Sequence, residues 1–296
     1  MTAKPMAKAP AATVSWRRAQ QALRAEVERV TRLLRSVRAP SAPALGDWTV
    51  AEVAMHLSQA WVAVPGLAQR DLSAVHALLP GLEGGAGASL IRDMWDLGDV
   101  TRRGVASDPQ RDLSVLADRI GTRASEYLAG TGTSRANDLR PWLVEGAEVS
   151  LCTLTCHLLS ETIVHGWDIA RADGQPWSVK PAHAALVIDG FLMPVFRALG
   201  PRDLVNQELA AGLRATYEIR VRGGGRHVLV FDDGALTVEP PSSRQVDCCI
   251  SADPAALLLV VWGREHQARA IVERRLVVSG PKAWLGPRLR SLMRNP

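Results

Sequence analysis

Three side chains that can bind a metal ion stand at informative positions in this sequence. Glu161 and His165 are four residues apart in a segment predicted to be helical, so their side chains project from one face about one turn apart. His56 lies in a second predicted helix, and facing helices of a bundle can build metal sites between them. Two imidazoles and one carboxylate would leave a coordination position open, as in catalytic zinc sites. Spacing alone also fits a solvent-facing Glu–His pair, so both interpretations stand at this point.

Two further polar residues lie on the same predicted helix. His157 precedes Glu161 by four residues, so it could line a pocket, serve as an alternative ligand or be an ordinary polar position. Asp168 follows His165 by three residues and could accept a hydrogen bond that orients the imidazole. The alternatives for Asp168 are a structural cap and a salt bridge.

The four cysteines form two pairs. Cys152 and Cys156 have helical spacing, whereas Cys248 and Cys249 are adjacent in the second half of the chain. A zinc site made of all four would require the two halves to meet at that point, so small buried side chains are the favoured interpretation. Four cysteines in 296 residues do not predict a disulfide scaffold, and we expect a reducing cytoplasm.

The first half of the chain carries the periodicity of long amphipathic helices. Apolar residues recur at helical spacing from Trp16 to Val37, and the arginines between them are expected to form a solvated face. Thr49 and Glu52 form a capping box, which predicts a helix that runs towards Pro65.

Three more helices are predicted before the pattern changes. A short helix over 89–99 follows a glycine-rich loop, and a long helix is predicted to begin at Asp108-Pro109, with proline in the first helical position. The last spans 147–172 and ends at Gly174, with a buried stripe at Cys152, Cys156, Leu159, Ile163 and Ala170. Together, four long amphipathic helices predict a helical bundle.

After Pro176 the sequence changes to a mixture of strands and helices. A helix is predicted over 181–199, followed by strands over 216–221, 227–231, 235–238 and 246–251. Asp253-Pro254 should start another helix, and a strand over 276–279 precedes a last helix over 281–293. This pattern predicts a small α+β unit that is distinct from the bundle.

Two segments resemble motifs of the mycothiol-dependent maleylpyruvate isomerase family. Residues 48–57, WTVAEVAMHL, resemble the motif of that family's second helix. Residues 161–172, ETIVHGWDIARA, together with the following Gly174-Gln175-Pro176, resemble the motif of its fourth helix. In the C-terminal half the resemblance rests on the order of elements and on Val278-Ser279-Gly280 before the final helix.

The resemblance implies a multidomain chain. Its parts would be an all-α DinB-like four-helix bundle that binds a metal and a small α+β domain similar to sterol carrier proteins. We expect a disordered tail over 1–13, the bundle over 14–175, a connecting helix and linker over 176–204, and the α+β domain over 205–296. The resemblance further implies that His56, Glu161 and His165 are the metal ligands.

The implied activity is that of a metal-dependent and mycothiol-dependent enzyme. A divalent metal, with zinc favoured over iron or nickel, would activate the thiol of mycothiol as a metal-bound thiolate for addition to a small electrophile. Isomerisation of a cis double bond and transfer of the thiol both remain open. No catalytic residue is predicted beyond the thiol, and none of Arg220, Arg222 and Arg226, which flank a hairpin turn, is assigned to a substrate carboxylate. The alternative is a non-catalytic protein that binds a metal and an apolar ligand.

The net charge of +5 first suggests an anionic polymer or membrane as partner. The excess lies at the ends, because residues 1–47 hold nine basic and three acidic groups and residues 264–296 hold eight and two. With three Phe and two Tyr, stacking platforms for single strands are scarce. The longest apolar run, over 255–262, is too short for a bilayer, and the N-terminus has no secretory signal. We therefore expect a cytoplasmic protein with small-molecule partners; a nucleic-acid binder that uses the basic ends is a third alternative.

Overall fold

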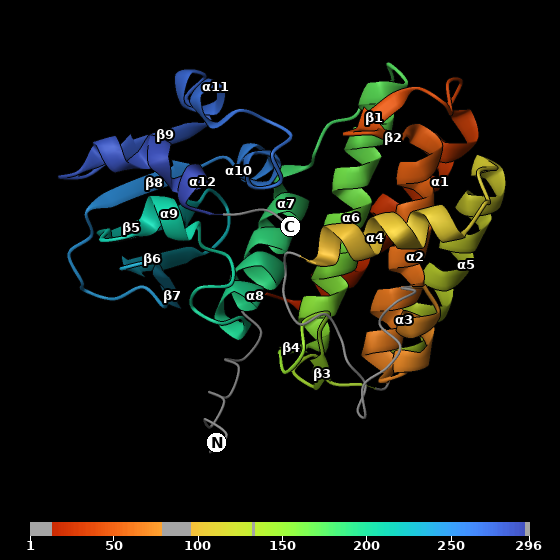
Figure 1. Cartoon of the computed structure of the whole chain (residues 1–296), viewed down its shortest axis with the longest axis horizontal. Helices are drawn as coiled ribbons and strands as arrows, with labels where there is room; N and C mark the ends of the chain where they lie inside the picture. Colours follow the sequence, from red (N-terminus) through yellow and green to blue (C-terminus); the bar gives the residue numbers. More distant parts are fainter. Residues whose placement is uncertain (1–13, 79–95, 132–133, 294–296) are drawn as a thin grey trace.

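The computed structural model describes residues 14–78, 96–131 and 134–293, and Figure 1 shows a helical N-terminal half beside a sheet-containing C-terminal half. The predicted tail over 1–13 and the glycines of the predicted loop over 81–87 lie outside the described residues. The helices of the first half are α1 (Trp16–Ser36), α2 (Val50–Gln69), α3 (Leu72–Leu78), α4 (Asp96–Ser107), α5 (Leu113–Gly130) and α6 (Leu151–Ala172). Two short hairpins accompany them: β1 (Pro43–Leu45) with β2 (Trp48–Thr49), and β3 (Leu139–Pro141) with β4 (Glu148–Ser150).

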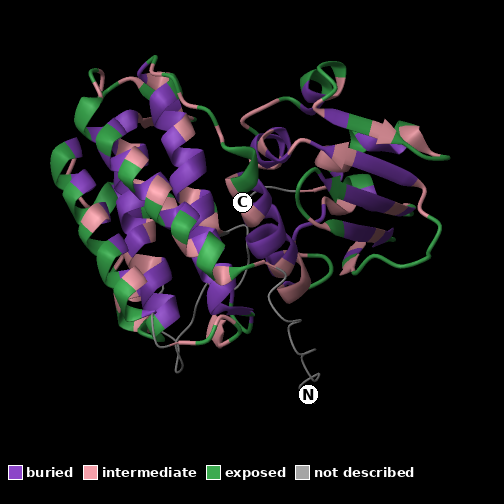
Figure 2. Cartoon of the chain, turned by 180° about the vertical axis from the view of Figure 1, so that it is seen from behind, coloured by how far each residue is buried: buried purple, intermediate pink, exposed green. Residues whose placement is uncertain are grey.

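The predicted helical bundle consists of α1, α2, α5 and α6. Helix α6 is buried along almost its whole length, because α1 and α2 pack on one side and the segment after residue 180 packs on the other. The predicted stripe on α6 is confirmed, since Cys152, Cys156, Leu159, Ile163 and Ala170 are all buried. Apart from the half-buried Arg29, the arginines within α1 are exposed, as expected for a solvated face. Figure 2 shows these buried stripes facing inward.

The start of α2 is the one that the capping box predicted. The Thr49 side chain accepts a hydrogen bond from the Glu52 backbone N–H at 3.3 Å, and the Thr49 N–H donates to Glu52 Oε2 at 2.8 Å. The helix does not stop near Pro65, however, but continues to Gln69. Pro65 is buried together with its neighbours Val64 and Leu67, so packing outweighs the one backbone hydrogen bond that proline cannot make.

Three other predicted boundaries in this half are wrong. Helix α5 begins at Leu113 rather than at Asp108, because Asp112 caps it by accepting from Ser114 N at 2.8 Å, whereas Asp108 accepts from Gln110 N in a turn. The start of α6 is Leu151 rather than 147, since residues 148–150 form β4. The helix predicted over 89–99 corresponds in its described part to α4, which continues to Ser107.

The helix predicted over 181–199 is present in three joined segments. They are α7 (Pro181–Val187), a π-helical turn (Ile188–Leu192) and α8 (Met193–Ala198). Within the π turn, an added Cβ at Gly190 would lie 2.5 Å from Cys156 Sγ, so only glycine lets the turn approach α6 so closely. Asp189 reaches the other way, accepting from the Gly225 N–H at 2.7 Å and contacting His227 Nε2 at 2.7 Å. This turn therefore contacts both halves of the chain, and the division predicted at 175 and 205 remains a prediction.

The C-terminal half is built on a mixed sheet of five strands in the order β7-β6-β5-β8-β9. Neighbouring strands are antiparallel except β5 and β8, which are parallel. Its elements are α9 (Gln207–Ala210), β5 (Arg214–Val221), β6 (Arg226–Asp232), β7 (Ala235–Glu239), β8 (Cys248–Ala252), α10 (Pro254–Val261), α11 (Gln267–Val272) and β9 (Leu276–Ser279). The predicted final helix over 281–293 is a 3₁₀ segment (Ala283–Arg288) followed by α12 (Leu289–Leu292), with Pro287 inside the 3₁₀ part. The structure thus confirms the predicted fold class, a helical bundle followed by an α+β unit.

The register of the sheet determines which residues share a face. Ile219 on β5 is opposite both His227 and Ile250, so these side chains point to one side. Leu229 lies two residues from His227 on β6, and Leu276 lies two residues from Val278, the partner of Ile250. These positions form the buried inner face of the sheet. Glu218 and Arg220 alternate with them and belong to the opposite, outer face.

Candidate metal centre

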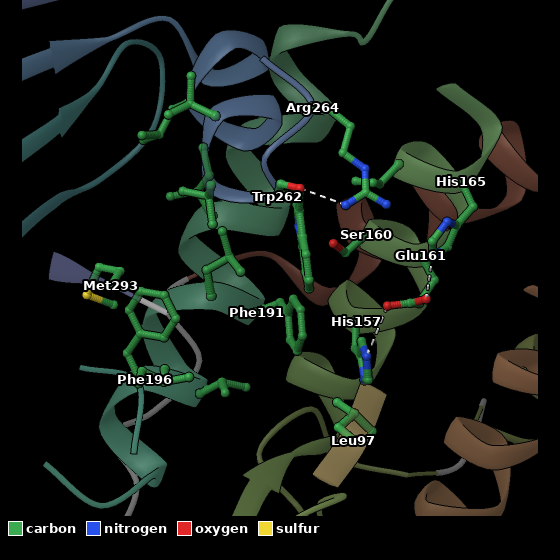
Figure 3. A pocket seen from close by; sticks show the side chains of 18 of the residues that line it. Leu97, His157, Ser160, Glu161, His165, Phe191, Phe196, Trp262, Arg264 and Met293 are labelled. Carbon is green, nitrogen blue, oxygen red and sulfur yellow. Dashed lines mark hydrogen bonds and ion pairs between the residues drawn. The ribbon is translucent and has the colours of Figure 1, made fainter. Parts of the chain in front are cut away.

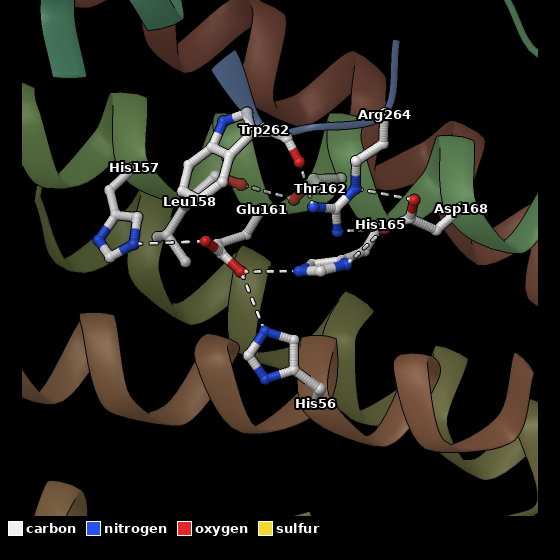
Figure 4. A network of polar contacts seen from close by, with 9 residues as sticks. All are labelled: His56, His157, Leu158, Glu161, Thr162, His165, Asp168, Trp262 and Arg264. Carbon is white, nitrogen blue, oxygen red and sulfur yellow. Dashed lines mark hydrogen bonds and ion pairs between the residues drawn. The ribbon is translucent and has the colours of Figure 1, made fainter. Parts of the chain in front are cut away.

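The structure brings His56, Glu161 and His165 together between α2 and α6, as predicted. His56 Nε2 and His165 Nε2 each lie 3.3 Å from Glu161 Oε2 (Figure 4). One ligand atom from each of the three residues lies within 4.8 Å of the others, and this is the group of potential metal ligands found among the described residues. The cluster forms because α2 and α6 face each other and the four-residue spacing places Glu161 and His165 on the same face.

The donor set fits a divalent metal ion. Two imidazole nitrogens and one carboxylate oxygen are ligands of zinc, and they also suit iron or nickel. Three protein ligands leave a position open for a further ligand. The site is largely sheltered, since the side chains of His56, Glu161 and His165 are 19%, 12% and 10% exposed. The solvent-facing Glu–His pair that spacing alone allowed is therefore wrong.

The carboxylate of Glu161 is held ionised by its neighbours. Burial would raise the pKa of this carboxyl group, but hydrogen bonds with His157, His165 and His56 outweigh burial and hold the pKa well below its usual range. Burial lowers the pKa of His56. Burial also disfavours the charged form of His165, yet hydrogen bonds with Asp168 and Glu161 raise its pKa to about 9. In the metal-free protein, His165 therefore keeps its proton to a higher pH than an ordinary imidazole does.

Asp168 contacts the imidazole of His165, which was one of the alternatives that its spacing left open. Its Oδ2 lies 3.1 Å from His165 Nδ1, which leaves His165 Nε2 directed towards Glu161 and His56. The alternative salt-bridge role is present as well. Arg264, from the loop after α10, donates through Nε to Oδ1 at 3.0 Å and through Nη2 to Oδ2 at 2.8 Å. This fork is a two-bond contact between the C-terminal half and the candidate metal centre.

Arg264 was not among the predicted site residues, because no local pattern selects it. Arg264 and Asp168 are 96 residues apart, and many arginines compete for such a role. The only usable signal was that a carboxylate at a helical core position needs a cation nearby. Arg264 Nη1 also donates to the carbonyl oxygen of Trp262 at 2.6 Å, so the guanidinium is well anchored.

His157 lines the site but does not join the ligand cluster. Its Nε2 lies 3.4 Å from Glu161 Oε1, the oxygen that does not face His56 and His165. Its ring stacks on Phe191 of the π turn, with centroids 4.3 Å apart and an interplanar angle of 8°. Of the alternatives left open, the pocket-lining position is the one observed.

The remaining candidates lie elsewhere in the structure. The four cysteines are free and buried, with one pair on α6 and the other on β8, and no four-cysteine group forms within the described part of the chain. Arg220 and Arg226 pair with Glu218 on the outer face of the sheet, and Arg222 donates to the Arg275 carbonyl at 2.7 Å. None of these three arginines lines the cavity beside the candidate metal centre.

A cavity of about 460 Å³ opens beside the three candidate ligands. Figure 3 shows Glu161 and His165 at one end and apolar side chains such as Phe196 and Met293 at the other. The volume is in the range of ordinary small-molecule sites. Within the described ranges, none of the helices is both long and apolar enough to cross a lipid bilayer.

Residues 196–292 match the SCP-2 sterol transfer family. Two crystal structures of the mycothiol-dependent maleylpyruvate isomerase, the first of a mutant, are similar to this chain at 12% identity. The similarity to the mutant structure covers 90% of this chain and 93% of that chain, with a TM-score of 0.49. For the second structure the shares are 85% and 90%, with a TM-score of 0.45.

Another structure, described as the ubiquinone synthesis protein UbiJ-SCP2, is 18% identical over 39% of this chain and 97% of its own, with a TM-score of 0.24. No curated protein sequence matches the chain. The SCP-2 match falls on the α+β unit.

Proposed function

We propose that this protein is a metal- and mycothiol-dependent enzyme of the maleylpyruvate isomerase type. The observation that carries the proposal is the convergence of His56, Glu161 and His165 at the end of a sheltered cavity. Two of the three residues, Glu161 and His165, lie in the fourth-helix motif, and His56 lies in the second-helix motif. Two neutral imidazoles and one carboxylate would leave a divalent ion with a net positive charge, which favours binding of a thiolate.

The residues around the site have separable tasks. His56, Glu161 and His165 would hold the metal, which when bound lowers the pKa of a thiol and so supplies a thiolate at neutral pH. Asp168 fixes the orientation of His165, and Arg264 neutralises Asp168. His157 contacts the second carboxylate oxygen of Glu161, which leaves the first oxygen for the site.

The reaction would need no net oxidation or reduction. The thiolate sulfur forms a bond with one carbon of an activated double bond while the π electron pair moves to the conjugated carbonyl oxygen. Rotation about the carbon–carbon bond that was the double bond, followed by return of the electron pair from the oxygen and expulsion of the same thiolate, then regenerates the double bond in the trans form. If a proton is added to the neighbouring carbon instead, the adduct is retained and the thiol has been transferred.

The ligand assignment can be tested by metal analysis of purified protein. We expect wild type to contain one equivalent of a divalent metal and His165→Ala to lose it. His266→Ala is the matched control, because His266 is exposed, caps α11 and does not line the cavity. Equal metal content in His165→Ala and wild type would overturn the assignment.

The reaction itself needs a separate experiment. Metal-loaded protein is incubated with mycothiol and a panel of electrophiles that includes maleylpyruvate, and the products are identified by mass and chromatography. An isomerised product of unchanged mass indicates an isomerase, whereas a product heavier by one mycothiol indicates a transferase. Absence of both with every electrophile, at full metal content, would contradict an enzymatic role.

The apolar wall of the cavity favours one second candidate, a non-catalytic protein that binds a metal and an apolar ligand. A thermal-shift titration separates the two candidates, because a ligand that binds only the folded state raises the melting temperature. Stabilisation by mycothiol supports the enzyme. Stabilisation by fatty acids alone supports the binding protein.

A further inference from the structure

The cavity beside the candidate metal centre is continuous with the interior of the C-terminal half. Its wall includes His56, Glu161 and His165 from the bundle and also residues of the inner sheet face. Four strands contribute one side chain each to that wall: Ile219, Leu229, Ile250 and Leu276. Opposite them lie apolar side chains of α8, α10 and α12, among them Phe196, Leu257 and Leu289. We call the part of the cavity formed by these seven residues the aliphatic chamber.

Polar groups are distributed unevenly along this cavity. Apart from Arg290, the ionisable side chains of the described wall lie at the bundle end: His56, His157, Glu161, His165 and Arg264. In the C-terminal half the wall contains Gln267 and Arg290, and both are engaged with the backbone. Gln267 Nε2 donates to the Gly286 carbonyl at 2.7 Å, and Arg290 donates to the carbonyls of Val260 and Met293 at 3.1 and 3.0 Å. The aliphatic chamber therefore offers an apolar surface.

A small dicarboxylate fits this wall poorly. Arg264 and Arg290 are the two arginines among its described lining residues, and each already has partners. Arg264 in particular uses its Nε and Nη2 fork for Asp168. The one cation of the C-terminal part of this wall, among the described residues, is Arg290, whose Nε and Nη1 are already bonded to backbone carbonyls, so a second carboxylate there would lose its hydration with little compensation.

Between the candidate metal centre and the chamber, the wall carries buried donors that lack acceptors. Ser160 Oγ and Trp262 Nε1 are both buried, and, like Trp142 Nε1 and His157 Nδ1 of the same wall, neither has a hydrogen-bond partner among the described residues. Both side chains line the cavity, and Figure 3 shows Ser160 next to Glu161, with Trp262 beside it. Buried donors are nearly always satisfied in native proteins, so these two point to an acceptor on a bound molecule.

We propose that the substrate is amphipathic, with one carbonyl-containing electrophilic head and an aliphatic tail. The head accepts hydrogen bonds from Ser160 Oγ and Trp262 Nε1 beside the candidate metal centre, and the tail occupies the aliphatic chamber. This inference rests on the proposed function and specifies the class of electrophile. The thiol would add to the double bond conjugated with the head carbonyl, with the electron balance given above.

Direct binding measurements test the inference without turnover. A fluorescent fatty acid is displaced from zinc-loaded protein by straight-chain 2-enoic acids of four to twelve carbons and by a four-carbon unsaturated dicarboxylate. We expect affinity to rise about three- to fourfold per added methylene until the chamber is filled, as burial of one CH₂ predicts. Equal affinity at all lengths, or tightest binding of the dicarboxylate, would overturn the inference.

Variants of the sheet locate the tail. Ile250→Phe fills the chamber from its inner face, and Val277→Phe is the matched control on the neighbouring strand, because Val277 is 43% exposed and points to the outer face. We expect Ile250→Phe to shorten the chain length that binds best, and Val277→Phe to leave it unchanged. Should Ile250→Phe fail to fold, Val261→Phe tests the same wall from the half-buried end of α10. An unchanged optimum in folded chamber variants contradicts the assignment.

The head group is tested with Ser160→Ala. This variant should weaken binding of a long 2-enoic acid severalfold while binding of an alkane of equal length is unchanged, because only the acid offers a carbonyl acceptor. Equal effects on both ligands would remove Ser160 from the head site. Mycothiol consumption then separates the two proposals. If mycothiol reacts with short dicarboxylates and long acids at equal rates, the inference of an amphipathic substrate is refuted and the proposed enzyme stands. If binding depends on chain length but no thiol reacts, the proposed enzyme is refuted.

Discussion

Replacing Asp168 with asparagine should weaken metal binding and the fold by two separate routes. Asp168 is 1% exposed, and its carboxylate contacts both His165 and Arg264. His165 contacts Oδ2, and Arg264 donates to both oxygens. Asparagine keeps the shape but removes the charge. His165 then loses the negative charge that raises its pKa, and Arg264, which keeps the neutral Trp262 carbonyl as a partner, becomes a buried cation without a counter-charge.

The two losses have different magnitudes. Removing a carboxylate that orients a metal-binding histidine typically lowers metal affinity about 10- to 100-fold, which is about 1.4 to 2.7 kcal/mol. Breaking a buried ion pair from one side costs about 3 to 5 kcal/mol of folding free energy. The side chains of Arg264 and Asp168 are 13% and 2% exposed, so the pair belongs to the buried class. The pKa of His165 should fall from about 9 towards 6.5.

Three measurements follow the effects separately. Competition with a chromophoric chelator gives the metal affinity, urea unfolding of the metal-free protein gives its stability, and NMR titration gives the pKa of His165. The double variant Asp168→Asn/Arg264→Gln removes the unpaired cation, so stability should recover in part while metal affinity stays low. Asp232→Asn is the matched control, because its pairing with Arg214 at 3.1 Å is exposed and should be worth less than about 1 kcal/mol.

The reasoning fails if Asp168→Asn changes metal affinity less than about twofold. It also fails if the double variant regains metal affinity together with stability, since the effect on the metal would then be a consequence of the fold. An unchanged pKa of His165 would show that Glu161 alone holds its proton.

Three further predictions concern pH, a buried carboxylate and a close approach. Because a metal competes with the proton on His165, metal affinity should rise about tenfold per pH unit up to about 9; a flat profile between pH 6 and 9 in the chelator assay would contradict this. Burial opposes the charge of Glu26, but His183, whose Nδ1 lies 2.7 Å away, and Lys180 outweigh burial and lower the pKa of the carboxyl group. The ionised carboxylate of Glu26 should therefore stabilise the fold above the ordinary pKa of 4.5, and this contribution should be lost as the pH falls through the lower pKa of the folded state. In urea unfolding, Glu26→Gln should lower the free energy of unfolding by about 3 kcal/mol at pH 7 and by clearly less below pH 4. Gly190→Ala should lower the melting temperature, with a cost of about 1 to 3 kcal/mol, since the new Cβ would lie 2.5 Å from Cys156 Sγ, whereas Gly121→Ala, with nothing within 4 Å, should leave it equal or raise it.

Local chemistry allowed the helices that carry the candidate ligands to be predicted. The capping box of Thr49 and Glu52 determines where α2 begins, and therefore the helical position of His56. The four-residue spacing of Glu161 and His165 requires that both face the same side of α6. Where two local signals competed, the prediction was wrong, because Asp112 rather than Asp108 caps α5. Both aspartates are suitable caps, and packing of the helix decides between them.

The amino-acid sequence by itself thus determined the capped start of α2, the shared face of Glu161 and His165 and the change from bundle to α+β unit, since all depend on neighbours a few positions apart, whereas the complete ligand set was implied by the resemblance to a family. Only the tertiary structure decided that Arg264 pairs with Asp168, 96 residues away, and that His157 faces the second oxygen of Glu161. It also joined the candidate metal centre to the inner face of the sheet in one cavity. These features depend on how two independently patterned halves pack against each other, and helical periodicity or strand alternation contains no information about that docking.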